Sequence, residues 1–558
     1  MVMKNRLRMA SIMTLGILAL GFGTGLCAEP CNTCDSLAHL TIPNVTINSA
    51  TLVEATATLP EHCRIEGGRF YDHFIIKLPT DWNERYYQVG NGADAGLIQE
   101  AGIDVGIAQG FASASGSGGH TEPNPIFPTF AFAYPSDDAA AQQKLNDYCQ
   151  DSVHETMLLA KMFMAVYYCD VDGPEYAYYN SCSTGGRQGL IEAQRFPEDF
   201  DGLLIGAPSN YLTEITTRGV WEGQQLSGTG AVDPAKLPLL SAAVMEACDD
   251  IDGLEDGLIN DPRNCTFDAL ADLPACANDV DGADCFTTAQ RQAIYNIYDG
   301  PRTSDGTQTT FGEAYGSEAV IQFPAYLGGG TGSGWMFWIV PPPPMPMSLG
   351  LSLGDGFVKY AGLPPSGEGG VNWDYTTFDF NADFDTVVNN MSTACDAIDP
   401  DLSTLQGMGG KMIMYGGWSD PATGPYQWVN YYEEVLSTMG DAETKEFFKL
   451  YMIPGMSHCG GGLGCFDSTV LFDALVDWVE NGTEPATYTG AGVNSNGDPR
   501  TRPMCPFPQV AVYSGSGNID DATNFTCEDP TAQAAADTTG SSGGGSSGCF
   551  ISTVLESR

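Results

Sequence analysis

A serine held in a turn of small residues is the first place in this sequence where a nucleophile could form. Ser183 lies in the run Ser-Cys-Ser-Thr-Gly (181–185), which follows an aromatic segment at 175–179 and leads into residues with helical spacing. A strand, a tight turn and a helix in this order expose a serine hydroxyl and direct the next backbone N–H at the reacting carbonyl oxygen. The pattern therefore predicts Ser183 as a nucleophile and Thr184 as the first oxyanion donor. Ser181 replaces the first glycine of the usual motif, so an ordinary Ser- and Gly-rich loop is the alternative.

The order of residues along the chain selects the general base. In the strand–turn–helix arrangement the serine comes first, the acid second and the histidine last. Of six histidines, His458 alone follows Ser183, and it lies in a glycine-rich loop after the apolar run 447–453. A lone loop histidine is otherwise a structural residue. The required order favours His458 as the base.

Asp420 is the candidate acid. It follows the apolar run 411–415, which is typical of a buried strand, and a turn fixed by Pro421 comes directly after it. A carboxylate at the end of a strand can hold the histidine ring in the required tautomer and stabilise its charged form. An Asx turn before proline is the alternative interpretation.

The second oxyanion donor is expected in the glycine-rich loop 90–96, which follows a short strand at 86–89. An early loop of this kind supplies that donor where a serine sits on a strand-to-helix turn. The N–H of Gly92 and the N–H of Ala93 are both candidates, and the sequence does not choose between them. The loop lacks the Gly-Lys-Ser ending of a phosphate loop, so nucleotide binding is not expected.

Two cysteines flank the catalytic candidates, since Cys182 immediately precedes the nucleophile and Cys459 immediately follows the base. With this Cys-Ser, Asp and His-Cys arrangement, the chain over about 31–527 resembles the tannase and feruloyl esterase family. The resemblance implies an α/β fold with an α/β-hydrolase core, a Cys182–Cys459 disulfide and a Ser-His-Asp carboxylic ester hydrolase. It also implies aryl-ester substrates: hydroxycinnamates on plant polysaccharide, galloyl esters of tannins, or mono(2-hydroxyethyl) terephthalate.

A long insertion separates the nucleophile from the acid and the base. Residues 29–209 and 404–530 are predicted to form the hydrolase core, and residues 210–403 a lid rich in glycine, proline and aromatic side chains. These aromatic side chains either wall an aryl-ester pocket or pack the core of the lid itself. The candidate substrate-binding residues are Trp335, Trp338 and the basic residue Lys359.

A dense group of carboxylates within the lid, at 248–258, predicts a cation site. Three aspartates in a tight loop repel one another unless a cation neutralises them, and oxygen ligands favour calcium. The spacing differs from that of an EF-hand, and a solvated acidic turn is the alternative. The family resemblance implies a calcium loop with these ligands: the side chains of Asp249, Asp252 and Asp256 and the carbonyls of Leu254 and Leu258. No organic cofactor is expected.

Charge limits the partners of this chain. Its 558 residues include 23 basic and 70 acidic side chains, which gives a net charge of −47. Such a surface repels nucleic acid and anionic membranes, so neither is an expected partner. The sequence does not indicate an oligomeric state.

The two ends of the chain indicate its destination. Residues 1–28 combine basic residues, an apolar run and small residues, as in a secretory signal peptide that is too short for a stable membrane span. Cleavage there would remove one of 17 cysteines and leave 16, an even number that suits an oxidising compartment. Residues 531–558 form a Gly- and Ser-rich tail ending near Cys549, similar to bacterial sorting or lipid-attachment tails. A secreted or cell-surface bacterial protein is expected, and the pairing of Cys31, Cys34, Cys149, Cys169, Cys395 and Cys465 stays open.

Neutral hydroxycinnamoyl or galloyl esters, small or attached to a polymer, are the preferred substrates. A free carboxylate needs a cation, the lid has few, and the negative field of the protein opposes an anion except where salt screens it. Mono(2-hydroxyethyl) terephthalate is therefore the second choice. The alternative of another class is a non-catalytic, surface-anchored binding protein on a hydrolase fold.

Overall fold

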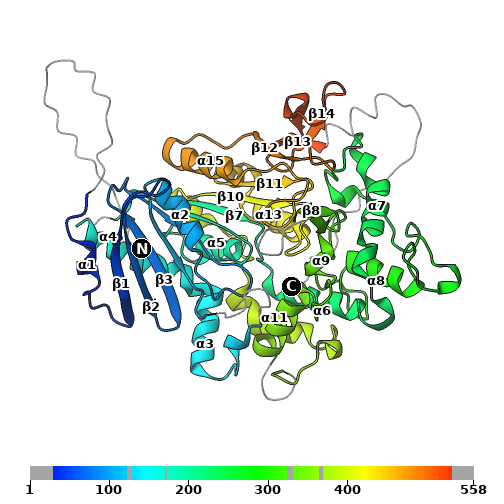
Figure 1. The fold of residues 1–558 in the computed structure, drawn as a ribbon, viewed down its shortest axis with the longest axis horizontal. Helices are drawn as coiled ribbons and strands as arrows, with labels where there is room; N and C mark the ends of the chain where they lie inside the picture. The colour runs from blue at the N-terminus through cyan, green and yellow to red at the C-terminus, as the bar shows by residue number, and fades with distance from the viewer. Residues whose placement is uncertain (1–28, 122–128, 170–172, 323–330, 364–368, 531–558) are drawn as a thin grey trace.

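The structure is a computed structural model that describes residues 29–121, 129–169, 173–322, 331–363 and 369–530 (Figure 1). The predicted signal peptide and the Gly- and Ser-rich tail lie outside the described residues. None of the described helices is long and apolar enough to cross a membrane.

A mostly parallel sheet forms the centre of this mixed α/β protein (Figure 1). The first three strands and their junction with β5 are antiparallel, and all later neighbours are parallel. The nine strands of this sheet, in spatial order, are β1 (Val45–Val53), β2 (His62–Arg69), β3 (Asp72–Pro79), β5 (Ala112–Gly116), β4 (Arg85–Gln88), β6 (Tyr176–Cys182), β7 (Gly202–Gly206), β10 (Lys411–Gly417) and β11 (Phe448–Ile453). Because parallel strands end at the same edge, the loops after β6, β10 and β11 meet there.

Helices cover both faces of the sheet, and apolar residues that alternate along the strands pack against them. On β10, Met412 and Met414 face the cluster that contains helices α4 (Ser152–Tyr167), α5 (Thr184–Arg195) and α13 (Pro425–Met439). Ile413 and Tyr415 face the opposite cluster, which contains α15 (Ser468–Asn481). This period of two is the pattern of a strand buried on both sides.

The elements predicted around the nucleophile differ from the observed ones mainly at their ends. Helix α5 begins at Thr184, directly after the turn, and not at the first apolar residue of the periodic segment. The first turn of α5 holds Thr184, Gly185, Gly186 and Arg187, which carry no hydrophobic periodicity, and that is why the pattern did not reveal it.

The segment at 210–403, named here the insertion, lies between β7 and β10. Its helices gather on one side of the molecule, away from β1–β3 (Figure 1). They include α6 (Leu212–Gln225), α7 (Leu237–Cys248), α8 (Thr288–Asp299), α9 (Trp335–Trp338), α10 (Leu349–Phe357) and α11 (Phe384–Cys395).

Glycines bring α6 and α10 into backbone contact. A Cβ on Gly219 would lie 2.3 Å from the carbonyl oxygen of Gly350, and a Cβ on Gly354 would lie 2.3 Å from that of Thr216. Real Cβ atoms do not approach that closely, so any larger residue would push the two helices apart. This close pair of helices forms one side of the pocket described below.

Seven disulfides are present in the described part of the chain: Cys31–Cys169, Cys34–Cys63, Cys149–Cys395, Cys182–Cys459, Cys248–Cys265, Cys276–Cys285 and Cys505–Cys527. Cys465 is buried and is in none of these bridges. So many disulfides fit an extracellular, oxidising environment.

One of these bridges closes the insertion onto the core. Cys395 at the end of α11 is bonded to Cys149, which precedes α4. The buried guanidinium of Arg187 on α5 donates to the carbonyl oxygens of both cysteines, at 2.9 and 3.0 Å. The end of the insertion is therefore fixed against the helix that follows the nucleophile.

Two hairpins complete the chain: β12 (Tyr488–Val493) with β13 (Pro499–Met504), and β14 (Val510–Tyr513) with β15 (Phe525–Glu528). They lie beside the upper part of the insertion in the view of Figure 1.

Candidate active site

Ser183 occupies a strained turn between β6 and α5. Its φ of 67° and ψ of −126° lie outside the regions that L-residues ordinarily adopt. Its own N–H donates to the carbonyl oxygen of Gly206 at 3.0 Å, which holds the turn to β7. A Cβ on Gly185 would lie 1.9 Å from Ser181 Oγ, and a Cβ on Gly186 would lie 2.4 Å from the carbonyl oxygen of Gly206. The small residues of this turn are thus required by packing.

Ser183, His458 and Asp420 form a continuous hydrogen-bonded chain. His458 Nε2 lies 2.9 Å from Ser183 Oγ, and His458 Nδ1 lies 2.7 Å from Asp420 Oδ2. With the proton on Nδ1, the ring donates to the carboxylate and accepts from the hydroxyl. These distances and this order are the geometry of a serine nucleophile with its general base and orienting acid.

The protein itself holds the Asp420 carboxylate in place. This residue is fully buried, and its Oδ1 accepts from the N–H groups of Ala422 at 2.7 Å and Thr423 at 3.3 Å. Thr423 Oγ1 adds a contact to Oδ2 at 3.4 Å. Each carboxylate oxygen therefore has a partner before any substrate binds.

The disulfide expected beside the site joins the nucleophile's strand to the histidine's loop. Cys182 is the last residue of β6, and Cys459 directly follows His458. On its other side, the His458 ring meets the ring of Trp338 edge to face, with centroids 5.2 Å apart. A covalent bond and an aromatic contact therefore restrain the loop that carries the base.

Two backbone N–H groups beside Ser183 are available to an oxyanion. No acceptor within the described residues reaches the N–H of Thr184 or that of Ala93. Thr184 Oγ1 donates to the carbonyl oxygen of Ala93 at 2.5 Å and so ties the two donors together. Ala93 lines the same cavity as Ser183 and Thr184, whereas Gly92 does not, which favours Ala93 as the second donor.

A cavity of about 590 Å³, counting its open mouth, extends from Ser183. Most of its wall is apolar, and one face of α6 runs along its length. The apolar lining includes Phe130, Tyr148, Leu212, Ile215, Trp338 and Leu353.

Of the three predicted substrate-binding residues, Trp338 alone lines this cavity. Trp335 is buried in the core of the insertion, where its Nε1–H donates to Ser317 Oγ at 2.8 Å. Lys359 forms an ion pair with Asp355, 2.5 Å apart and one helical turn away. The structure therefore does not bring Trp335 or Lys359 to Ser183.

Three charged residues at the cavity were missed by the sequence analysis. Arg218 and Glu222 are one turn apart on α6 and line the cavity, and Arg218 also meets Glu313 behind it. The residues of α6 that line the cavity recur at helical spacing: Leu212, Ile215, Gly219 and Glu222. A charged residue on this otherwise apolar face could have been recognised from the sequence. The position of Glu313 was not readable, because no local pattern links it to α6.

The acidic loop at 248–258 has features that fit a cation and one that differs from expectation. Asp249, Asp252 and Asp256 each accept backbone N–H groups from within the loop. Burial, with the charges of its two neighbours, raises the pKa of Asp252 to about 7. Among the described residues, no donor reaches the carbonyl oxygen of Leu254 or of the buried Leu258. Carboxylates that repel one another beside free carbonyls form a donor set suited to calcium.

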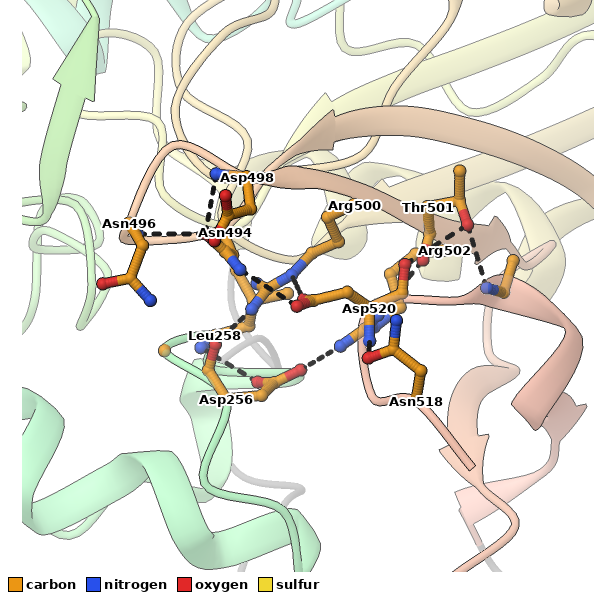
Figure 2. Close-up of polar contacts among 12 residues, drawn as sticks. Asp256, Leu258, Asn494, Asn496, Asp498, Arg500, Thr501, Arg502, Asn518 and Asp520 are labelled. Atoms are coloured by element: carbon orange, nitrogen blue, oxygen red, sulfur yellow. Dashed lines mark hydrogen bonds and ion pairs between the residues drawn. The ribbon is translucent and has the colours of Figure 1, made fainter. Parts of the chain in front are cut away.

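The unexpected feature is a pair of arginines from β13 that both contact Asp256 (Figure 2). Arg502 forms an ion pair with the Asp256 carboxylate, and Arg500 donates to the Asp256 carbonyl oxygen at 2.7 Å. Arg500 is itself held by Asp520 at 2.6 Å. One of the three carboxylates is therefore already partly neutralised, and the C-terminal hairpin is joined to the loop.

His154, Glu192 and Asp199 form a separate group whose ligand atoms lie within 4.8 Å of one another. His154 Nδ1 already lies 2.5 Å from Asp199 Oδ2, and Lys161 Nζ lies 3.4 Å from the other Asp199 oxygen. These ion pairs neutralise Asp199 without a metal, so we interpret the group as part of the packing of α4 against α5.

Comparison with known proteins places these observations among esterases. A family model described as tannase and feruloyl esterase matches residues 63–528. The chain is 31% identical to an uncharacterized esterase of Xanthomonas campestris pv. campestris, covering 89% of this chain and 91% of the relative. It is 30% identical to the mono(2-hydroxyethyl) terephthalate hydrolase of Piscinibacter sakaiensis, covering 87% and 89%. It is 27% identical to feruloyl esterase B of Aspergillus niger, covering 81% and 82%.

Solved structures share the fold. Feruloyl esterase B from Aspergillus oryzae matches with a TM-score of 0.73 and 24% identity, over 89% of this chain and 99% of that one. The tannin acyl hydrolase from Aspergillus niger matches with a TM-score of 0.69 and 20% identity, over 91% and 95%.

Proposed function

This chain belongs to the tannase and feruloyl esterase family and is a carboxylic ester hydrolase, and we propose that it cleaves neutral phenolic esters through Ser183, His458 and Asp420. The observation that carries the catalytic assignment is the unbroken Ser183–His458–Asp420 hydrogen-bond chain at the end of an aromatic-lined cavity. The core is an α/β-hydrolase fold (29–209 and 404–530), and the insertion is its lid.

The reaction follows from the positions of these groups. His458 takes the Ser183 proton as Oγ attacks the ester carbonyl, and Asp420 orients and stabilises the charged imidazole. The N–H groups of Thr184 and Ala93 stabilise the tetrahedral oxyanion. His458 then returns the proton to the departing alcohol, and water hydrolyses the acyl-serine by the same steps. The Cys182–Cys459 bridge keeps the nucleophile and the base together through both halves.

Neutral phenolic acyl groups are the proposed substrates, either hydroxycinnamoyl or galloyl. The aromatic lining of the cavity suits a flat ring. The names of the relatives cover feruloyl, tannin and terephthalate esters, so an aryl acid is common to them. Lys359, the candidate partner for a free carboxylate, is already paired with Asp355. Mono(2-hydroxyethyl) terephthalate is the second candidate.

Turnover tests the catalytic assignment directly. Ser183→Ala should lower kcat for a p-nitrophenyl ester by about 10⁴-fold or more. Ser403→Ala, at an exposed position of the same chain, should behave as wild type. If the Ser183→Ala rate stays near that of wild type, Ser183 is not the nucleophile.

Rates for methyl ferulate, methyl gallate and mono(2-hydroxyethyl) terephthalate, measured side by side, test the substrate class. Faster turnover of the two neutral esters is expected. Fastest turnover of the terephthalate ester, lost selectively in Lys359→Ala, would show that the preference for neutral esters is wrong.

Calcium is the proposed structural cofactor of the lid, with no organic cofactor. The side chains of Asp249, Asp252 and Asp256 and the carbonyls of Leu254 and Leu258 would hold it, and its charge would offset the repulsion among the three carboxylates. The raised pKa of Asp252 and the free carbonyls support this assignment.

Removing calcium should lower the melting temperature, because an ion bound only by the folded state adds stability by mass action, about 2.7 kcal/mol at 100 times its Kd. Asp252→Asn should abolish the response to a chelator. Asp250→Asn, an exposed neighbour outside the ligand set, should retain it. The proposal fails if chelation leaves the melting temperature unchanged and elemental analysis finds no calcium.

We also propose that a bacterial cell secretes this protein, either to the extracellular medium or to the cell surface. It is supported by the seven disulfides and by the signal-like sequence at 1–28.

A further inference from the structure

One face of helix α6 forms a continuous wall along the cavity. Leu212, Ile215, Gly219 and Glu222 all line it, at intervals of three or four residues. Ser209, which lies just before α6, donates its N–H to the carbonyl oxygen of Ser183 at 3.2 Å. The wall therefore starts beside the nucleophile. Ten residues of helix between Leu212 and Glu222 span about 15 Å, so Glu222 lies toward the far end.

A buried charge cluster extends from Glu222 back to the loop of Asp420. Arg218 Nε lies 3.3 Å from Glu222 Oε1, and Arg218 Nη2 lies 3.1 Å from Glu313 Oε1. Arg218 Nη2 also donates to the carbonyl oxygen of Ala422 at 3.1 Å. The side chains are 4% exposed or less. One guanidinium therefore faces two carboxyl groups in an environment with little water.

The cluster is incompletely hydrogen-bonded. The contacts of Glu222 Oε1 and Glu313 Oε1 with Arg218 lack hydrogen-bond geometry, and neither Glu313 Oε2 nor Arg218 Nη1 forms a hydrogen bond with such geometry among the described residues. Burial, followed by the charge of Glu313, raises the pKa of Glu222 well above its usual range, and burial raises that of Glu313 to about 7. At neutral pH the pair therefore retains a proton and can both donate and accept. Unmatched buried polar groups cost about 1–3 kcal/mol each, so a ligand that completes their hydrogen bonds binds favourably.

The acyl group is the part of the substrate that can reach this cluster. An ester carbonyl must sit between Ser183 Oγ and the N–H groups of Thr184 and Ala93, three residues that line the cavity. A polymeric alcohol cannot fit inside a cavity of about 590 Å³, so it must leave through the mouth. The aryl ring then extends along α6 with its outer edge toward Glu222.

We propose that Glu222, supported by Arg218, is a specificity-determining residue that hydrogen-bonds a ring hydroxyl of the phenolic acyl group. This assignment rests on the proposed function and names the substrate group that the far end of the site selects. A phenol can donate to the Glu222 carboxyl and accept from it. A terephthalate carboxylate would instead add a negative charge beside two carboxyl groups, and an unsubstituted ring would leave the cluster unmatched.

The test compares esters that differ only in the ring hydroxyls: methyl p-coumarate against methyl cinnamate, and methyl gallate against methyl benzoate. Wild type should prefer the hydroxylated member of at least one pair. Glu222→Leu should lower this selectivity ratio of kcat/KM by about 10- to 100-fold, the rate equivalent of one buried hydrogen bond. Glu222→Gln keeps the shape and part of the hydrogen bonding, and should give a smaller decrease if the leucine variant does not fold.

A matched control is Glu214→Gln on the same helix, whose carboxylate contacts Gln427 and does not line the cavity. It should retain the wild-type ratio. A merely structural role for Glu222 would lower both rates of a pair together and leave the ratio unchanged, which would overturn the inference. Equal wild-type rates on both members of both pairs would overturn it as well. Failure of the proposed function has a different signature, namely activity retained by Ser183→Ala.

Discussion

The two ends of the cavity hold buried charges in opposite states. At the Ser183 end, both nitrogens of the His458 ring and both oxygens of Asp420 have partners within hydrogen-bonding distance. At the Glu222 end, four buried polar atoms of Arg218, Glu222 and Glu313 form no hydrogen bond among the described residues, although Glu222 Oε1 and Glu313 Oε1 lie 3.3 and 3.1 Å from nitrogens of Arg218. Both clusters combine a carboxylate with a cationic or ionisable base and are similarly buried, so burial alone does not explain the difference.

The difference teaches which interactions the fold supplies by itself. Groups that transfer protons must be held in one geometry before the substrate arrives, because preorganisation is what lowers the barrier. Groups that recognise a ligand gain by being left incomplete, since the ligand then provides the missing hydrogen bonds. The contrast predicts that changes at the first end alter rate and that changes at the second alter stability and selectivity.

The largest expected effect is on rate, from Asp420→Asn. The asparagine oxygen can still accept from Ala422 and Thr423, but its amide would force the wrong tautomer on His458, so kcat should fall by about 10⁴-fold. Thermal unfolding should change little. Asp467→Asn is the control, because Asp467 caps α15 and asparagine caps a helix as well as aspartate does. More than a tenth of wild-type activity in Asp420→Asn would contradict the role given to Asp420.

Arg218→Met should have the largest effect on stability. It leaves two buried carboxyl groups without their cation, and breaking a buried pair in this way costs about 3–5 kcal/mol. The exposed pair Arg302–Asp299 provides the control, since Arg302→Met should cost about 1 kcal/mol or less. Denaturant unfolding measures both variants. Equal losses would mean that the far cluster is no more dependent on its charge balance than a surface pair.

Removal of the bridge beside the triad should affect activity more than folding. In Cys182→Ser combined with Cys459→Ser, the His458 loop loses a covalent restraint, and a misplacement of the base lowers kcat by about 10- to 100-fold. Cys276→Ser with Cys285→Ser removes a bridge inside the insertion and should leave kcat near wild type. If mass mapping finds Cys182 and Cys459 bonded to other cysteines, the explanation is wrong.

The smallest expected effect is a pH dependence of stability from the far cluster. The folded pKa of Glu313 is raised to about 7, above the usual value of 4.5, so the folded state binds the extra proton between these pH values. Stability from this group is present at low pH and is lost as pH rises through about 7, by up to about 1.4 kcal/mol per pH unit for one proton.

Melting temperatures from pH 5 to pH 8 in saturating calcium measure this dependence. Other buried carboxyl groups contribute to the wild-type slope, so the difference between wild type and Glu313→Gln is the quantity to compare. The variant should show the shallower decline. Parallel curves would exclude a proton held by the Glu222–Glu313 pair.

The sequence predicted the catalytic end far better than the far end. Ser183, Asp420 and His458 were selected from chain order and from their places after apolar runs, and those are properties of local sequence. The structure brings the three side chains together as expected. The choice between Gly92 and Ala93 required the cavity, because both residues lie in the same loop.

The far end depends on contacts that no local pattern carries. Arg218 and Glu222 come from α6 and Glu313 from a loop some 90 residues later, so their meeting results from how the insertion folds. Trp335 shows the opposite error: the sequence analysis placed it at the substrate site, whereas its side chain is buried in the insertion's own core. Likewise, nothing in the acidic run 248–258 indicated that arginines of β13 would contact Asp256.

The bridge between Cys149 and Cys395 has a consequence for how such esterases can diversify. The insertion leaves the core after β7 and is fastened to it again at Cys395, where Arg187 holds both cysteine carbonyl oxygens. The segment between these anchor points can lengthen, shorten or be exchanged without loosening α5, the helix that directly follows the nucleophile. The chain thus has the layout of a cassette, in which an exchanged segment must keep the contacts of Trp338 with His458 and of Arg218 with Ala422.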